Sequence, residues 1–192
     1  MERQSDFELE KLLERHLSAV ALAVRRVSQD STERLVSFIL GAERVFVTGQ
    51  GRSGLIAGCF ATRLTQMGFR VHIPGQPTCR RIQARDLMIA VSCSGVTSTT
   101  IEFARISREA GSSTALITSS ADSVLADMAD ETILIPANDP DIRKSCQCVV
   151  GPRNNTVFEE SALLYLDALV YVLLERTDIP KDMMGQSHTN LE

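Results

Sequence analysis

The sequence has no tryptophan and few other aromatic residues, which limits the ligands that it can bind by stacking. Only 5% of its 192 residues are aromatic. Proteins that bind single-stranded nucleic acid stack the bases on such rings. A basic excess is also missing, because the net charge at pH 7 is −4, so little would be gained by releasing counterions from phosphates. We therefore expect small molecules and other copies of the chain as partners, and no nucleic acid.

Long apolar runs and a leader of the secretory type are lacking too. The charged start Met1–Asp6 is not followed by an apolar segment, and no later apolar run is long enough to span a bilayer. The five cysteines are odd in number and scattered, as in proteins whose thiols stay reduced. These features predict a cytoplasmic protein with no membrane partner.

Metal-binding patterns are scarce as well. The pair Cys146 and Cys148 has one residue between the two cysteines, which is too few for a structural zinc site, and no second Cys/His pair completes it. We predict no metal. The 44% of apolar residues and 23% of charged residues are those of an ordinary globular chain.

One domain is predicted over residues 1–192, in three parts. Residues 1–41 carry two helices: an amphipathic one over 6–27, opened by a capping box of Ser5 and Glu8, and a second that ends at Gly41. An α/β core follows over 44–176, and residues 177–192 form a tail with a short helix after Pro180. The N-terminal pair is expected to pack outside the main sheet or against another subunit.

From residue 44 onward, predicted strands alternate with predicted helices. The strands are Arg44–Thr48, Arg70–Pro74, Asp86–Ser92, Thr114–Thr118 and Glu131–Pro136. The helices are Leu55–Met67, Ser98–Ala110, Ser123–Ala129 and Thr156–Arg176. Continuous apolar strands are buried on both faces, so the pattern predicts an α/β fold: a three-layer αβα sandwich with a five-stranded parallel sheet. Residues 137–155 lack periodicity and are expected to form a functional or mobile loop.

The first candidate ligand loop is Gly49–Gly54, which reads Gly-Gln-Gly-Arg-Ser-Gly after the first strand of the core. Glycines allow close approach of the backbone to an anion, and the following helix presents free N–H groups. Gly51, Arg52 and Ser53 are therefore predicted to bind phosphate, although Arg52 could instead pair with a carboxylate. The same spacing fits a dinucleotide fingerprint, but the acidic residue expected about 20 positions later is missing, which disfavours a nicotinamide cofactor.

The second candidate loop is Ser92–Thr97, whose residues are Ser92, Cys93, Ser94, Gly95, Val96 and Thr97. Hydroxyls and backbone N–H groups in a tight turn hold phosphate without a lysine cluster. Thr97 or Ser98 could instead only cap the following helix. More hydroxyls are present than one cap needs, so we predict a phosphate-binding cup.

These two motifs together resemble the sugar isomerase (SIS) domain, and more closely the 6-phospho-3-hexuloisomerase family. The matching segments are Val45–Gly54, Phe60–Phe69, Asp86–Thr97, Leu125–Asp130, Thr156–Glu159 and His188–Glu192. Two loops, Gly75–Arg80 and Gly151–Asn155, depart from the family pattern. The resemblance implies conversion of D-arabino-hex-3-ulose 6-phosphate to fructose 6-phosphate, in the ribulose monophosphate pathway of formaldehyde fixation. It also implies a homotetramer that needs no metal or other cofactor.

The resemblance further implies two catalytic residues, Glu159 and His188. Moving a carbonyl from C3 to C2 needs a base that also acts as an acid. By position alone, Glu159 would be read as a carboxylate that complements a helix dipole, and His188 as a solvated histidine of a polar tail. The family match favours Glu159 as the base and His188 as a proton carrier, which could serve a neighbouring subunit.

Three other functions remain open from the sequence. The chain could be another SIS isomerase, acting on arabinose 5-phosphate or sedoheptulose 7-phosphate. It could also be a sensor that binds a sugar phosphate without catalysis, although the presence of Glu159 and His188 speaks against that. The third, a nicotinamide-dependent oxidoreductase, is disfavoured by the missing acidic residue.

Overall fold

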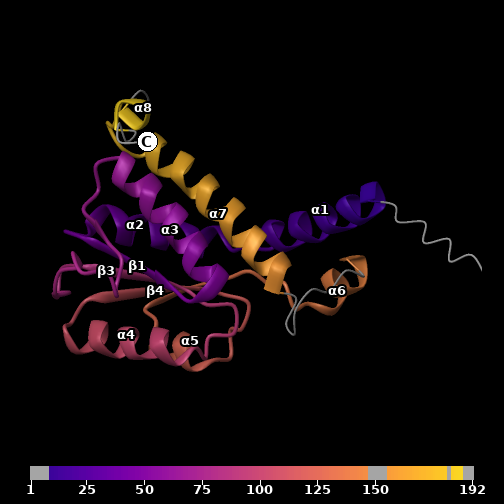
Figure 1. Cartoon of the computed structure of the whole chain (residues 1–192), viewed down its shortest axis with the longest axis horizontal. Coiled ribbons are helices and arrows are strands. Elements are labelled where there is room, and N and C mark those ends of the chain that lie inside the picture. Colours follow the sequence, from indigo (N-terminus) through magenta and orange to yellow (C-terminus); the bar gives the residue numbers. More distant parts are fainter. Residues whose placement is uncertain (1–8, 147–154, 181–182, 188–192) are drawn as a thin grey trace, which may run out of the picture.

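A five-stranded parallel sheet in the order β2-β1-β3-β4-β5 forms the centre of the structure (Figure 1). The computed structural model describes residues 9–146, 155–180 and 183–187. The strands are β1 (Val45–Gly49), β2 (Val71–His72), β3 (Leu87–Val91), β4 (Ser113–Thr118) and β5 (Glu131–Leu134). Every residue of β3 is buried, as expected for a central parallel strand covered on both faces.

Alternate residues of β1, β3 and β4 contribute to two separate cores. Val45, Val47 and Ile89 belong to the larger core, whereas Phe46 and Met88 belong to the smaller one. This alternation follows from the two-residue period of a strand. The sheet therefore separates two layers of helices, and the helices fall into two groups accordingly.

The larger core lies under α3 (Gly51–Gln66) and α7 (Asn155–Glu175), and the smaller one under α4 (Ser98–Glu109) and α5 (Val124–Met128). Figure 1 shows α4 and α5 on one side of the strands and α3 and α7 on the other. Two short helices, α6 (Pro140–Cys146) and α8 (Met183–Gln186), complete the chain. In the described part of the chain, no helix combines the length and apolarity that crossing a membrane requires.

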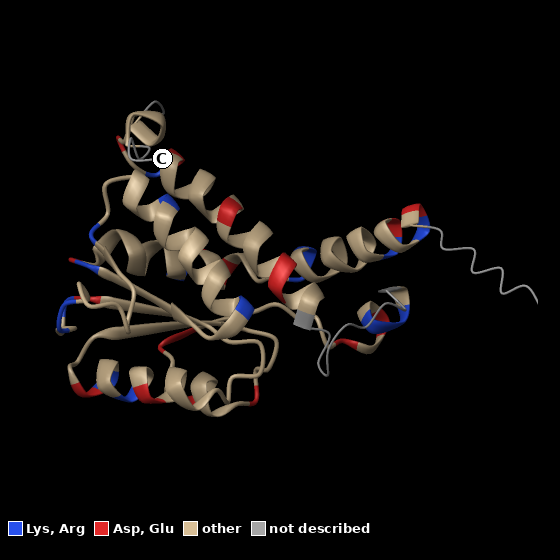
Figure 2. Cartoon of the chain, viewed as in Figure 1, with Lys and Arg blue, Asp and Glu red and all other residues tan. Residues whose placement is uncertain are grey.

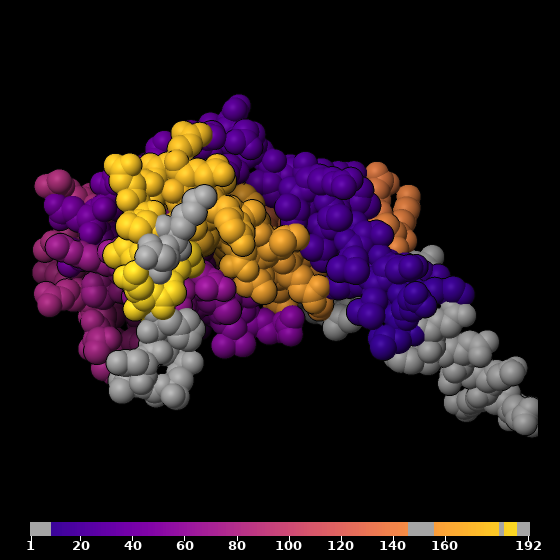
Figure 3. Space-filling model, turned by 90° about the horizontal axis from the view of Figure 1, so that it is seen from above, coloured from indigo at the N-terminus to yellow at the C-terminus, as the bar shows by residue number. Residues whose placement is uncertain are grey.

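The two N-terminal helices extend the layer that holds α7. Helix α1 (Leu9–Arg25) packs against α7 and α6, and the two long helices lie side by side on the surface (Figure 3). Helix α2 (Gln29–Gly41) contacts β5 and α7. Its Arg34 forms an ion pair with the buried carboxylate of Glu131, at the beginning of β5. The expected packing outside the sheet is thus present within one chain.

The predicted α/β fold, with helices on both sides of a parallel five-stranded sheet, is confirmed. Several details differ from the prediction. Helix α3 begins at Gly51 rather than Leu55, β2 has only two residues, and the predicted loop 137–155 contains α6. Helix α3 can begin this early only because backbone segments lie very close together there. No sequence pattern predicts such a close approach. The proposed capping box of Ser5 and Glu8 lies outside the described residues.

Tyr165 of α7 is buried, and its hydroxyl connects α7 to α2. Its hydroxyl donates a hydrogen bond to Oγ1 of Thr32 over 3.2 Å, and the residue is 6% exposed. Burial disfavours the phenolate and raises the pKa of Tyr165 to about 12. The chain has no tryptophan, so the absorbance of tyrosine can be followed without interference.

We predict that the variant Tyr171→Phe, in which Tyr165 is the only tyrosine left, ionises with a midpoint near pH 12. The pKa of Tyr165 is higher in the folded state than in the unfolded state. The protonated phenol therefore makes its full contribution to the free energy of unfolding below about pH 10, and this contribution is lost as the pH rises toward about 12. Absorbance of the phenolate measures the midpoint, and circular dichroism reports whether the chain is still folded. Ionisation of a folded chain near pH 10 would contradict the buried position.

Candidate functional site

The two candidate loops meet where the direction of the chain through the sheet reverses. After β1 the chain moves outward to β2, and it then returns to the other side of β1 to form β3 and later β4. In open parallel sheets, ligands bind in the crevice at such a switch point, beyond the carboxyl ends of the strands. A cavity of about 280 Å³ lies there, between the end of β3 and the beginning of α3.

The first wall of this cavity is the tight connection from β1 into α3. A Cβ atom at Gly49 would lie 2.8 Å from the carbonyl oxygen of Ser53 and 2.9 Å from that of Val91, so only glycine fits. The side chain of Gln50, at the N-cap position of α3, makes no capping hydrogen bond. The N-terminus of α3 therefore offers backbone N–H groups and a partial positive charge to an anion in the cavity.

The second wall is the loop Ser92–Thr97, between β3 and α4. Thr97 occupies the N-cap position of α4, but its side chain makes no capping bond; its hydroxyl lies 3.3 Å from that of Ser92. The side chain of Thr97 therefore does not cap α4. Gly95 has a φ of +64°, and a Cβ there would come within 2.0 Å of Oγ of Ser123.

A hydrogen-bonded row of polar groups supports this second wall from behind. The hydroxyl of Ser119 donates to the carbonyl oxygen of Cys93 over 3.0 Å, and it accepts from Nδ2 of Asn138, also over 3.0 Å. Both residues follow neighbouring strands, β4 and β5, at the same edge of the sheet. Sequence reasoning missed these residues, although Ser119 directly follows β4 and gave a usable signal.

Glu159 enters the cavity from α7, far along the chain. Its carboxylate Oε2 accepts a hydrogen bond from Nε of Arg52 over 2.5 Å. The Glu159 side chain is only 8% exposed, whereas that of Arg52 is 64% exposed. This bond raises the pKa of Arg52 above its usual value. In Figure 2 acidic residues colour the ribbon red near the beginning of α7, and a basic residue colours it blue near the beginning of α3.

The neighbouring carboxylate, Glu160, takes a different direction. It forms an ion pair with His16 of α1 and does not line the cavity. Successive residues of a helix point about 100° apart, so the two adjacent glutamates face two different sides of α7. The sequence alone could not decide which of the two faces the ligand.

The structure brings most of the predicted site residues together around one cavity. Those that line it are Gly51, Arg52, Ser53, Ser92, Cys93, Ser94, Thr97 and Glu159. Gly95 and Val96 belong to the same loop without lining the cavity, and His188 lies outside the described residues. Gln50 and Val91 line it too, although they were not predicted as binding residues.

The arrangement offers the chemistry of anion binding and proton transfer. Hydroxyls, backbone N–H groups and one guanidinium surround a single carboxylate. Within 9–146, 155–180 and 183–187, no three histidine, cysteine or acidic side chains lie close enough together to hold a metal ion. Nothing in the described residues therefore suggests a metal site.

Comparison with known proteins agrees with this geometry. Residues 38–150 match the SIS domain. The chain belongs to the SIS domain family. It is 31% identical to a 3-hexulose-6-phosphate isomerase of Bacillus subtilis over 99% of this chain and 100% of that protein. A 3-hexulose-6-phosphate isomerase of Mycobacterium gastri is 32% identical over 90% of this chain and 86% of its own.

This SIS protein is also similar to a solved structure. A Methanococcus jannaschii protein, whose crystal structure was reported to infer a 3-hexulose-6-phosphate isomerase function, superimposes with a TM-score of 0.78. It is 26% identical, and the match covers 96% of this chain and 99% of that one. The resemblance found in the sequence is confirmed, and the relatives support a sugar-phosphate isomerase.

We predict that Gly95→Ala destabilises the fold of this SIS protein much more than Gly75→Ala. Both glycines have positive φ, +64° and +93°, but only at Gly95 would the new methyl group collide with a neighbour, Ser123. The conformational cost is about 1–2 kcal/mol in each variant, and overpacking adds about 1–3 kcal/mol to Gly95→Ala alone. Urea unfolding measures both, and equal losses would contradict the close contact of the cup with Ser123.

Proposed function

We propose that this SIS protein converts D-arabino-hex-3-ulose 6-phosphate to D-fructose 6-phosphate, the second step of the ribulose monophosphate route of formaldehyde fixation. One observation carries the proposal: the buried carboxylate of Glu159 lines the same cavity as both phosphate-type loops. The named relatives support this substrate. The position of the carboxylate supports catalysis rather than binding alone.

The substrate phosphate is assigned to the cup Ser92–Thr97 and the beginning of α3. Hydroxyls of the cup and uncapped N–H groups of α3 suit a phosphate dianion. Arg52 uses its Nε–H for Glu159, and a guanidinium carries four further N–H groups. These remaining donors are available to oxygens of the sugar or of its phosphate.

Glu159 acts as the base in this mechanism. Its carboxylate removes the proton from C2, and the electrons of that C–H bond form a C2=C3 double bond while O3 takes up a proton. The resulting 2,3-enediol then loses the proton of O2, which forms the C2 carbonyl, and C3 receives a proton. No electrons are gained or lost overall, so the reaction needs no redox cofactor.

His188 is assigned the transfer of protons between O2 and O3, in the site of a second copy within a homotetramer. Ser187, the residue before it, lines another cavity together with Thr65 and His72, at the far end of α3 from Glu159. A 16-residue helix is about 24 Å long, so Ser187 is remote from the site of its own chain. Figure 1 shows α8 and the beginning of α7 at opposite ends of the layer.

We predict that Glu159→Gln lowers kcat at least about a hundredfold, because the amide cannot accept the C2 proton. The protein is coupled to a hexulose-phosphate synthase with ribulose 5-phosphate and formaldehyde, and fructose 6-phosphate is measured. The matched control is Glu160→Gln, the same change one residue later and outside the cavity, which should leave activity within a fewfold.

Two results would overturn parts of this proposal. Absence of product with the native chain would reject the assigned substrate. Undiminished activity of Glu159→Gln would reject Glu159 as the base while leaving the substrate intact.

We further predict that His188→Ala and Glu159→Gln, each inactive alone, regain part of the activity when they are unfolded and refolded together. A mixed oligomer contains sites in which an intact Glu159 from one copy meets an intact His188 from another. Native mass spectrometry confirms that mixed oligomers form. Mixed oligomers that stay inactive would show that the two residues must come from one chain.

A further inference from the structure

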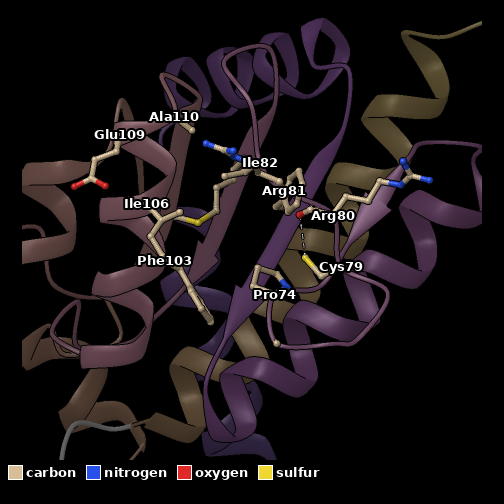
Figure 4. Close-up of a pocket in the computed structure, with 12 residues that line it drawn as sticks. Pro74, Cys79, Arg80, Arg81, Ile82, Phe103, Ile106, Glu109 and Ala110 are labelled. Carbon is tan, nitrogen blue, oxygen red and sulfur yellow. Dashed lines mark hydrogen bonds between the residues drawn. The ribbon is translucent and has the colours of Figure 1, made fainter.

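A second cavity lies apart from the candidate site and is larger than the cavity there. It measures about 530 Å³ and shares no lining residue with the cavity at Glu159. It lies on the other face of the sheet, between α4 and the segment Pro74–Ile82 (Figure 4). Its size falls in the range of cavities that hold small organic ligands.

The floor and one wall of this cavity are apolar. Phe46 and Met88 form its floor on β1 and β3, and Phe103 and Ile106 of α4 line one wall. Ile82 lines the opposite wall, and Figure 4 shows these side chains on both sides of the hollow. Ile106 remains 42% exposed, so a ligand in the cavity can reach it. Two phenyl rings favour a flat ring as the ligand.

The rim of the cavity is basic. Arg80 and Arg81 both line it, and neither forms an ion pair with another described residue. In Figure 4 the guanidinium of Arg81 reaches toward α4, whereas the side chain of Arg80 extends away from Phe103 and Ile106. Of these two arginines, Arg81 is therefore the one directed toward the apolar side chains of α4.

The one carboxylate that lines the cavity does not cancel this charge. Glu109 forms an ion pair with Arg105 on the outer face of α4. The segment 74–82, which forms the wall opposite α4, carries these two arginines and no acidic residue. Burial lowers the pKa of His72, and the charges of Arg44 and Arg80 lower it further, so Arg80 contributes to a positive field here. An anion is the ligand that this potential favours.

We propose that this cavity is a second ligand site, which binds an aromatic ring bearing a phosphate or carboxylate group. The ring packs between Ile82 and Phe103 over the floor formed by Phe46, and the anionic group binds Arg81. An uncharged ring would leave the guanidinium unused, and a sugar phosphate would leave the apolar walls in contact with water. The site is independent of the reaction assigned to Glu159.

The test measures binding of 8-anilinonaphthalene-1-sulfonate, an aromatic anion whose fluorescence rises in apolar surroundings. Arg81→Ala should weaken binding about tenfold, as expected for the loss of one charge-assisted hydrogen bond. Ile106→Glu, at an exposed position, should weaken it further by placing a negative charge on the wall. The matched control is Arg108→Ala, an exposed arginine of α4 that does not line the cavity.

Competitors identify the source of the anionic group. Displacement by AMP but not by indole-3-carboxylate assigns a nucleotide, and the reverse assigns an aryl carboxylate. Adenosine and ribose 5-phosphate, which each carry only half of the required chemistry, should displace the probe at least tenfold less well. The proposal is overturned if Arg108→Ala weakens binding as much as Arg81→Ala, or if neither aromatic anion displaces the probe. Circular dichroism checks that each variant is folded.

Discussion

The close contact of three backbone segments at Gly49 is the constraint on which the site depends. With no side chain at this position, the end of β1 can lie against the first turn of α3 and against Val91 of β3 at once. Helix α3 therefore begins two residues after β1 ends, and its N–H groups face the loop that follows β3. A larger residue would move α3 away from the sheet and separate the two walls of the cavity.

Placed in this way, α3 carries Arg52 to a position where it can reach α7. The ion pair between Arg52 and Glu159 joins two residues 107 positions apart, one largely exposed and one buried. A buried carboxylate without a partner would be costly, so the exposed arginine permits Glu159 to stay inside the cavity. The same pair leaves the guanidinium at the surface, where a ligand can reach it. One interaction thus stabilises the packing of α3 on α7 and orients the groups of the site.

Much of this arrangement could be predicted from local sequence. The continuous apolar strands predicted the parallel sheet, and the two polar loops predicted the edge of the sheet at which we expect a ligand. The beginning of α3 could not be predicted, because it depends on atoms of β3 that are close only in the folded chain. The support that Ser119 and Asn138 give to Cys93 was missed as well, although the position of Ser119 directly after β4 was a usable signal. Helix α6 was missed because its seven residues are too few for a periodic signal.

The distribution of charge makes a net charge of −4 compatible with the two proposed anion sites. Electrostatic potential at ordinary ionic strength decays over about 8 Å, so each site responds to its nearest charges rather than to the total. Residues 44–85 concentrate seven arginines without an acid, and this segment contributes both Arg52 and Arg81. Most acidic residues lie on other elements, such as α4 and α7, where many pair locally with arginine or histidine. A negative total charge is therefore compatible with two local basic positions, at Arg52 and Arg81, where we propose that small anions bind.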